Sequence, residues 1–277
     1  MNARPHFLPL RSLVLAALAL PLLAACASGP TPSQRQRADT GHALFEDRCK
    51  NVAGIKIYKT VAEVEGIVLL KVRPRPTSGW ADPMWPGAAF ALERWADEYI
   101  SSFLLYENAA GNGDGTPGSI TPSDRGYVSS RPSAYPGYRY VDVVEEGTGV
   151  KWRYSGYYDR PWERDPDRYS SKNPYSFWKL KREPAPAEGP RYGVTYEDHV
   201  IPEERALGLA SSTVKVLDLK TNEVLGEFTR YAWTPAKPNS ADPSPWLSAY
   251  KCPGHAVGAD AATRKFVDQV LLPRKDK

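Results

Sequence analysis

Two neighbouring runs of alternating apolar and polar residues, 213–218 and 224–233, are the clearest pattern in the chain. The polar turn Lys220-Thr221-Asn222 separates them, so the pair predicts a β-hairpin. The run over residues 66–72, which only Lys71 interrupts, is rich in Val, Ile and Leu, and its continuous apolar stretch predicts a strand buried on both faces. Shorter patterns predict further strands over residues 55–57, 138–145, 150–154 and 192–200.

Helical spacing is clearest near the C-terminus. Within residues 259–272 the apolar residues fall on one helical face, namely Ala262, Phe266, Val267, Val270 and Leu271. Residues 88–106 predict a short helix running into a strand, and residues 42–49 predict another short helix. Turn-forming residues predict a loop over 108–126, and prolines and charges predict a long excursion over 156–190. We therefore expect an α+β fold, mainly antiparallel β-sheet with long loops and a C-terminal helix.

The N-terminus carries an apolar run of a different kind, residues 13–25, preceded by Arg4 and Arg11. The run is 13 residues long, whereas a helix that spans a bilayer needs roughly 20. A basic start, a short apolar stretch and small residues at its end are the three parts of a secretory signal. The stretch closes on Leu23-Ala24-Ala25-Cys26, and the cysteine directly after the small residues favours a lipobox over an ordinary cleavable signal.

This N-terminal segment resembles the signal peptides of bacterial lipoproteins. The resemblance implies cleavage before Cys26 and acylation of that residue, for example with palmitate, which would anchor the protein in a membrane. Ala27 and Ser28 follow the cysteine, and the lack of Asp there implies sorting to the outer membrane, facing the periplasm. We therefore expect a removed signal peptide over residues 1–25, an anchor and flexible tether over 26–40, and a single α+β domain over 41–277.

The lipoprotein resemblance also accounts for the three cysteines. Cys26 would carry lipid, which leaves Cys49 and Cys252 in an oxidising periplasm. We expect these two to form a disulfide that joins the start of the domain to its end. The alternative is a pair of free, buried thiols.

Charge and motifs exclude several classes of function. The net charge is +4 over 277 residues, which argues against nucleic acid as a partner. The sequence contains no HExxH, paired CxxC or GxSxG motif, so we expect neither a metal site nor a cofactor. Residues 112–123 fail as a calcium loop because Pro117 and Ser123 stand where Gly and Glu are required. His199 follows Glu197 and Asp198, but a surface histidine at a strand end is the simpler interpretation.

Aromatic residues are concentrated between Tyr127 and Trp178. Thirteen of these 52 residues are aromatic, which is 25%, against 11% in the whole chain. Arg, Lys and Pro residues are interleaved with them. Aromatic and arginine side chains dominate the energetics of protein interfaces, and aromatic faces also stack on sugars. The alternative is that these rings only cover the core. The candidates for partner binding lie outside the expected strands: Tyr157, Tyr158, Trp162, Arg164, Arg168, Tyr169 and Trp178.

Three stretches of the body, residues 49–57, 64–67 and 214–225, are similar to parts of uncharacterised proteobacterial lipoproteins. That resemblance implies an envelope setting and no particular activity. We expect a lipid-anchored, non-enzymatic binding or assembly component whose partner is an envelope protein or cell-wall glycan. The alternative is a periplasmic hydrolase that acts on glycan or peptide through dispersed carboxylates.

Overall fold

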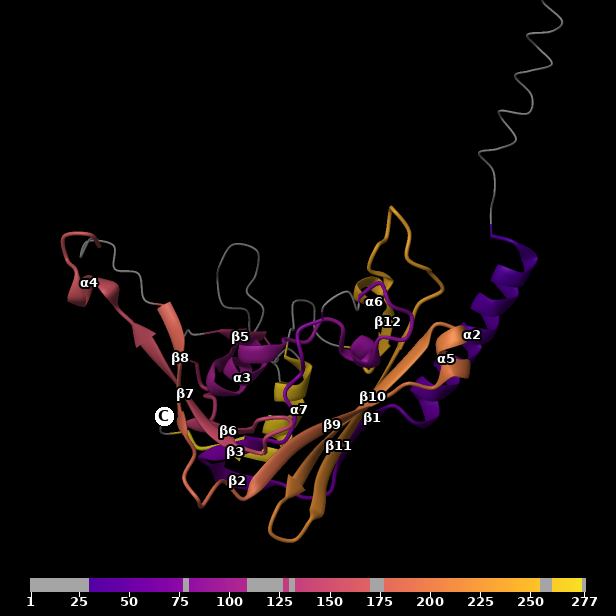
Figure 1. Cartoon of the computed structure of the whole chain (residues 1–277). Helices are drawn as coiled ribbons and strands as arrows, with labels where there is room; N and C mark the ends of the chain where they lie inside the picture. The colour runs from indigo at the N-terminus through magenta and orange to yellow at the C-terminus, as the bar shows by residue number, and fades with distance from the viewer. Residues whose placement is uncertain are drawn as a thin grey trace, which may run out of the picture.

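The computed structural model describes residues 30–76, 80–108, 127–129, 133–169, 177–254 and 261–275 (Figure 1). The predicted signal peptide over residues 1–25, the predicted lipidation site Cys26 and the rejected calcium loop over residues 112–123 lie outside these ranges. None of the described helices has the length and apolar character needed to cross a bilayer.

The main element of the fold, within the described residues, is a sheet of nine strands in the order β1-β11-β10-β9-β3-β6-β7-β8, with β12 beside β11 (Figure 1). The strand bounds are β1 Gly54–Ile57, β3 Gly66–Leu69, β6 Tyr140–Val144, β7 Lys151–Asp159, β8 Phe177–Pro184, β9 Tyr192–His199, β10 Leu209–Asp218, β11 Glu223–Trp233 and β12 Tyr250–Cys252. Every junction is antiparallel except those of β3, which pairs in parallel with β6 and with β9. The expected α+β class with a mainly antiparallel sheet is therefore confirmed.

Strand β3 lies at the centre of this sheet, and all four of its residues are buried. A central strand covered on both faces needs a continuous apolar run, which is what residues 66–69 supply. The hairpin expected from the alternating pattern is β10 and β11, with Asn222 at a positive φ of 59° in the turn. The strands expected over 138–145, 150–154 and 192–200 are β6, β7 and β9.

Two small strand pairs flank the main sheet. Strand β2 (Val61–Val64) pairs in parallel with β13 (Leu271–Pro273), and β4 (Tyr106–Asn108) pairs with β5 (Tyr127–Ser129). The helices are α2 Pro32–Asn51, the 3-10 helix η1 Pro86–Phe90, α3 Ala96–Leu104, α4 Pro161–Arg164, α5 Pro202–Ala206, α6 Pro245–Ser248 and α7 Ala262–Val270. The expected helix-to-strand passage near residue 104 is α3 followed by β4.

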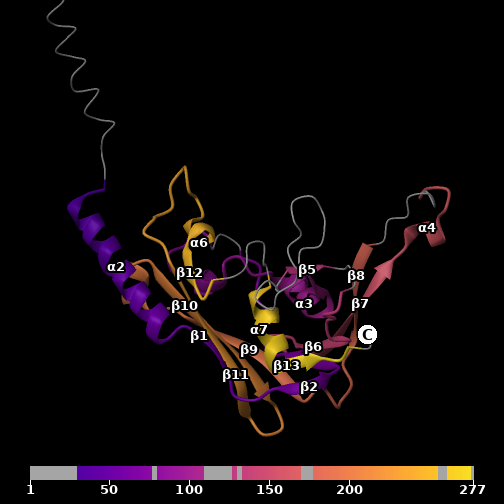
Figure 2. The same cartoon turned by 180° about the vertical axis from the view of Figure 1, so that it is seen from behind.

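The core lies between the sheet and the helices η1, α3 and α7 (Figures 1 and 2). Phe228 of β11 links two of these helices, because its ring centroid is 5.5 Å from that of Phe90 in η1 and 5.6 Å from that of Phe266 in α7. Helix α7 buries the apolar face that its sequence predicts, with Phe266, Val267 and Val270 fully covered. Burial of these faces, rather than helix propensity, holds the short helices in place.

Helix α2 is a correction to the sequence analysis, which expected a flexible tether as far as residue 40. The helix begins at Pro32, with Thr31 as its N-cap. Thr31 and Gln34 form a capping box, in which the Thr31 hydroxyl accepts from the Gln34 amide and the Gln34 side chain accepts from the Thr31 amide. The helix buries only Gly41 and Phe45, so it lacks the apolar period by which helices are usually found in a sequence.

A disulfide joins Cys49 near the end of α2 to Cys252 in β12, with Cα atoms 5.7 Å apart. This confirms the cysteine pairing expected from the sequence. The bond spans 203 residues of chain and lies beside a small second core formed by Phe45, Leu209, Tyr231 and Trp233. It therefore ties an N-terminal helix with little buried surface to the edge of the main sheet.

Candidate functional site

The expected excursion over residues 156–190 is in fact a long hairpin. Strand β7 extends to Asp159, the single turn α4 follows, and β8 returns along β7 from Phe177. We call β7, α4 and β8 the arm. It projects away from the body at the end of the molecule opposite to α2 (Figures 1 and 2).

One face of the arm belongs to the core. Tyr154, Trp178 and Leu180 are partly buried and pack against the main core cluster. Tyr158 meets Trp178 edge to face, with ring centroids 5.3 Å apart. Gly156 allows this packing, because a Cβ at that position would collide with the Trp178 ring. Tyr158 and Trp178, which the sequence analysis placed among the exposed candidates, thus have a structural role.

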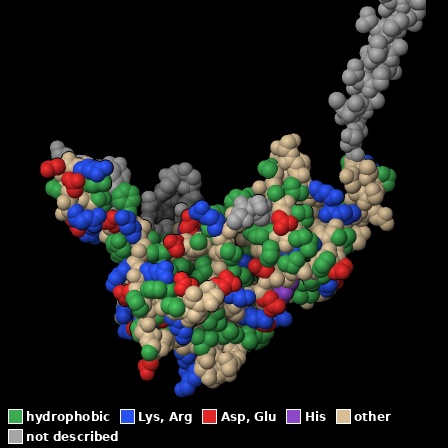
Figure 3. All heavy atoms as spheres, in the orientation of Figure 1, with side chains coloured by type: hydrophobic (Ala, Val, Ile, Leu, Met, Phe, Trp, Pro, Cys, Tyr) green, Lys and Arg blue, Asp and Glu red, His purple; other side chains and the backbone are tan. Residues whose placement is uncertain are grey.

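The opposite face of the arm, which we call the outer face, carries exposed aromatic rings. Tyr157 is 46% exposed and Phe177 50%, and Tyr169, in the segment that follows α4, is 36% exposed. Tyr157 lies opposite Lys179 in the strand register, and Asp159 lies opposite Phe177, so these side chains share one face. Figure 3 shows basic and apolar side chains next to one another over this part of the molecule.

Asp159 organises the tip of the arm. Its Oδ1 is 2.6 Å from Arg164 Nη1 and its Oδ2 is 2.6 Å from Lys179 Nζ. Hydrogen bonds from Arg164 and then from Lys179 lower the pKa of Asp159 to about 2. The Arg168 guanidinium lies 5.7 Å from the Tyr169 ring centroid. Trp162, in α4, is partly buried.

Of the seven candidates, Tyr157 and Arg164 are exposed on the arm, and Arg168 and Tyr169 are exposed in the segment that follows α4. Phe177 and Lys179 were not among the candidates. The β7–β8 register joins these two to the set, and a pairing register of that kind follows from no local pattern. Tyr138, another aromatic residue of the 127–178 segment, has a structural role, since it is fully buried and donates its hydroxyl to the Leu271 carbonyl.

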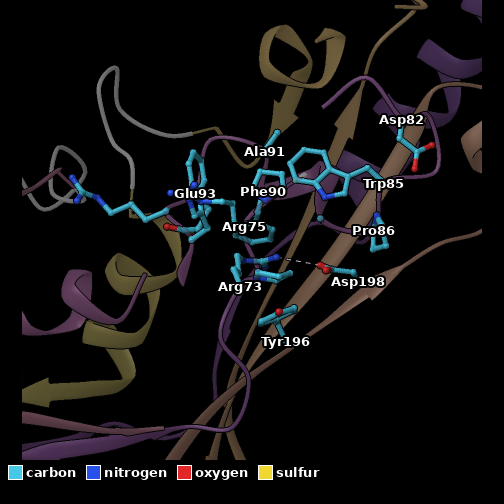
Figure 4. Close-up of a pocket in the computed structure, with 15 residues that line it drawn as sticks. Arg73, Arg75, Asp82, Trp85, Pro86, Phe90, Ala91, Glu93, Tyr196 and Asp198 are labelled. Atoms are coloured by element: carbon cyan, nitrogen blue, oxygen red, sulfur yellow. Dashed lines mark hydrogen bonds and ion pairs between the residues drawn. The ribbon is translucent and has the colours of Figure 1, made fainter. Parts of the chain in front are cut away.

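A pocket of about 350 Å³ on the body is a second candidate site, which the sequence analysis did not foresee (Figure 4). It lies between η1, the segment after β3 and the end of β9. Its walls are Arg73, Pro74, Arg75, Pro76, Asp82, Trp85, Pro86, Gly87, Phe90, Ala91, Glu93, Arg94, Trp95, Tyr196 and Asp198. The residues that line it are up to 125 positions apart in the chain, so no motif could have revealed it.

The carboxylates of this pocket bear on the alternative of a hydrolase. Asp198 accepts from Arg73 Nη1 at 3.3 Å and from the Ser212 hydroxyl, so protein groups already engage it. Glu93 is buried, and Oε2 accepts from the Thr263 amide at 2.9 Å and from its hydroxyl at 2.7 Å. Burial raises the pKa of Glu93. The pocket wall thus has one buried acid, Glu93, one carboxylate paired with Arg73, Asp198, and one exposed carboxylate, Asp82, whose Oδ1 accepts from the Met84 amide.

Within the described ranges, no group of three or more His, Cys, Asp or Glu residues is placed to hold a metal ion. His199 Nε2 lies 3.1 Å from the Thr213 hydroxyl in a partly buried position. No protein-family model, curated protein or solved structure matches the chain. The arm and the pocket are therefore the features from which a function is inferred.

Proposed function

We propose that the protein is a lipid-anchored, non-enzymatic component of the bacterial cell envelope that binds an envelope protein through the outer face of its arm. Cys26 is the proposed anchor, and the outer membrane facing the periplasm is the proposed location. The observation that carries the binding role is the pair of exposed rings on that face, Tyr157 and Phe177, together with the exposed Tyr169 in the segment that follows α4.

These rings are not needed to build the fold. The core-facing side of the arm already contributes Tyr154, Trp178 and Leu180 to packing. Large rings left in water on the other side are available to a partner, and aromatic anchors of this kind supply most of the binding energy of protein interfaces. The adjacent Lys179 and Arg164 would give the interface a charged rim.

The position of the arm suits an anchored protein. The described chain begins beside α2, at the end of the molecule opposite to the arm (Figure 1). A lipid attached at Cys26 would therefore hold the molecule at one end and leave the outer face of the arm clear of the attachment point.

Photo-crosslinking in intact cells tests the binding role. A photoreactive residue at Tyr157 should give one discrete adduct with an envelope protein, and Phe177→Ala with Tyr169→Ala should abolish it. Tyr250 provides the matched control, because its ring is 64% exposed on β12, away from the arm. Equal adducts from positions 157 and 250 would contradict the proposal.

Cell-wall glycan is the other partner to be distinguished. If the partner is a protein, the protein should not sediment with purified cell wall. Sedimentation that depends on Tyr157 and Phe177 would show that the partner is cell-wall glycan instead.

The anchor is tested separately. Cys26→Ser should move the protein from the membrane to the soluble fraction and remove an acyl mass from its N-terminus. An unchanged distribution between the two fractions would reject the lipoprotein assignment.

A further inference from the structure

The pocket on the body contains a buried guanidinium with unused hydrogen-bond donors. Arg73 is 5% exposed, and its guanidinium carbon lies 4.3 Å from the ring centroid of Phe90 and 4.2 Å from that of Tyr196. Nη1 reaches Asp198, but Nε and Nη2 have no hydrogen-bond partner among the described residues. Buried donors of a charged group are costly to leave unpaired, so this position favours an acceptor brought by a ligand.

Two more buried arginines contact residues that line the pocket: Arg205 donates to the Pro86 carbonyl at 3.4 Å, and the Arg230 guanidinium lies 5.3 Å from the Phe90 ring centroid. Arg73, Arg205 and Arg230 are all buried, and Nε and Nη1 of both Arg205 and Arg230 also lack partners within the described part of the chain. Burial lowers the pKa of Arg205 and of Arg230 to about 10, so both remain cationic at neutral pH.

The carboxylates near these guanidiniums are already engaged by protein groups. Asp198 is the counter-charge of Arg73, and Glu204, with its side chain 13% exposed, is paired with Arg48 at 3.4 Å. Glu93 is buried and accepts from Thr263, and burial raises its pKa. The feature that favours a further acceptor is therefore the pair of Arg73 donors, Nε and Nη2, that are unpartnered among the described residues.

The rest of the lining is suited to an organic body rather than a bare inorganic ion. The indole of Trp85 stands at one side of the cavity, and Trp95 and three prolines also line it (Figure 4). Arg75 is exposed and adds a second cation to the wall. A volume of about 350 Å³ is at the small end of the range for ligand sites.

We propose that this pocket binds a small organic acid that carries a ring, with its carboxylate against Arg73 and Arg75 and its ring on the aromatic wall. Arginine pairs with a carboxylate through two parallel N–H donors, and an aromatic face accepts either a sugar ring or an aromatic ring. The site is separate from the arm, and the proposal is independent of the partner that the arm binds.

Titration calorimetry on the full chain tests this inference with four probes. Glucuronate and benzoate are the two carboxylates, and glucose and benzyl alcohol are their neutral counterparts. At least one acid should bind while its neutral counterpart does not, and the acid that binds identifies the ligand as a sugar acid or an aromatic acid. Arg75→Gln should weaken binding about tenfold, which corresponds to the loss of one charge-assisted contact. Arg73→Gln should abolish it.

The controls keep the result independent of folding. Arg75 is exposed, so Arg75→Gln should leave the melting temperature unchanged even if Arg73→Gln lowers it. Arg35→Gln, a second exposed arginine on α2, should bind the acid like the original protein. Three results would overturn the proposal: no heat from either acid up to about 10 mM, equal binding of acid and neutral probe, or equal affinity in the Arg75 and Arg35 variants. Inorganic phosphate that binds as well as the acid would also overturn it.

Discussion

At the scale of single residues, Asp159 shows how one carboxylate can organise an exposed element. It lies at the end of β7 and joins Arg164 of α4 to Lys179 of β8. The tip of an exposed hairpin has few apolar contacts to fix it, so charge-assisted hydrogen bonds are the interactions left to define its shape. The outer face of the arm thus depends on a residue that does not itself belong to the exposed aromatic set.

The lowered pKa of Asp159 predicts a pH dependence. Because the folded pKa is about 2 and the ordinary value is 3.8, the ionised carboxylate stabilises the fold above about pH 4. This contribution should be lost as the pH falls from about 4 through 2. Asp159→Asn should therefore lower the free energy of unfolding at pH 6, and the difference from the original protein should vanish near pH 2.

Urea unfolding followed at several pH values measures this effect. Glu163→Gln is the control, since Glu163 forms only an exposed ion pair with Arg160 at 3.2 Å. A difference between Asp159→Asn and the original protein that stays constant from pH 6 to pH 2 would show that the carboxylate is not held as the structure indicates.

At the scale of elements, the arm is stiffened by what its inner face buries. Gly156→Ala would place a Cβ against the Trp178 ring, which is itself packed on the core. Overpacking of this kind costs about 1–3 kcal/mol. We expect the free energy of unfolding to fall by that amount and the near-ultraviolet circular dichroism of the tryptophans to change. Ser155→Ala, the neighbouring position on β7, should do neither. An unchanged spectrum for Gly156→Ala would mean that Trp178 does not cover this glycine.

Helix α2 shows the opposite case, an element with local caps and little burial. Thr31→Ala removes the hydroxyl that accepts from the Gln34 amide, and loss of such a cap costs about 1 kcal/mol. Because the far end of the helix is held by Cys49, the effect should be confined to the first turns. Amide hydrogen exchange should become faster there but not near Cys49. Thr31→Ser should retain the original rate, and faster exchange along the whole helix would contradict the local role.

At the scale of the whole molecule, the sequence predicts what local patterns determine and misses what the tertiary arrangement determines. The β10–β11 hairpin and the face of α7 are visible in the sequence because each has its own apolar period, and strand β3 is visible because its apolar residues form a continuous run. Strand β8 was hidden, because exposed Lys and Arg residues interrupt its apolar positions. The start of α2 was not predicted either, although Thr31 and Gln34 have the sequence spacing of a capping box.

The candidate sites divide in the same way. The composition of residues 127–178 indicated an aromatic and basic surface, but only the β7–β8 register separates Tyr157 on the outer face from Tyr158 on the inner one. Adjacent residues of a strand point to opposite faces, so one residue of register decides which ring meets a partner. The pocket gave no sequence signal, since Arg73 and Asp198 come together only through the parallel pairing of β3 with β9.

The disulfide acts on the whole molecule, because it closes 203 residues of chain. In the chain-entropy model a loop of that size stabilises the folded state by roughly 5 kcal/mol, and removal of native disulfides typically costs about 2–5 kcal/mol. We expect the double variant Cys49→Ser, Cys252→Ser to lose about this much in urea unfolding. The small core around Phe45 and Trp233 is separate from the main one, so α2 should lose its exchange protection before the sheet does. Reduction of the original protein should reproduce the variant. Equal loss of protection in α2 and in β3 would instead show that the two cores unfold as one unit.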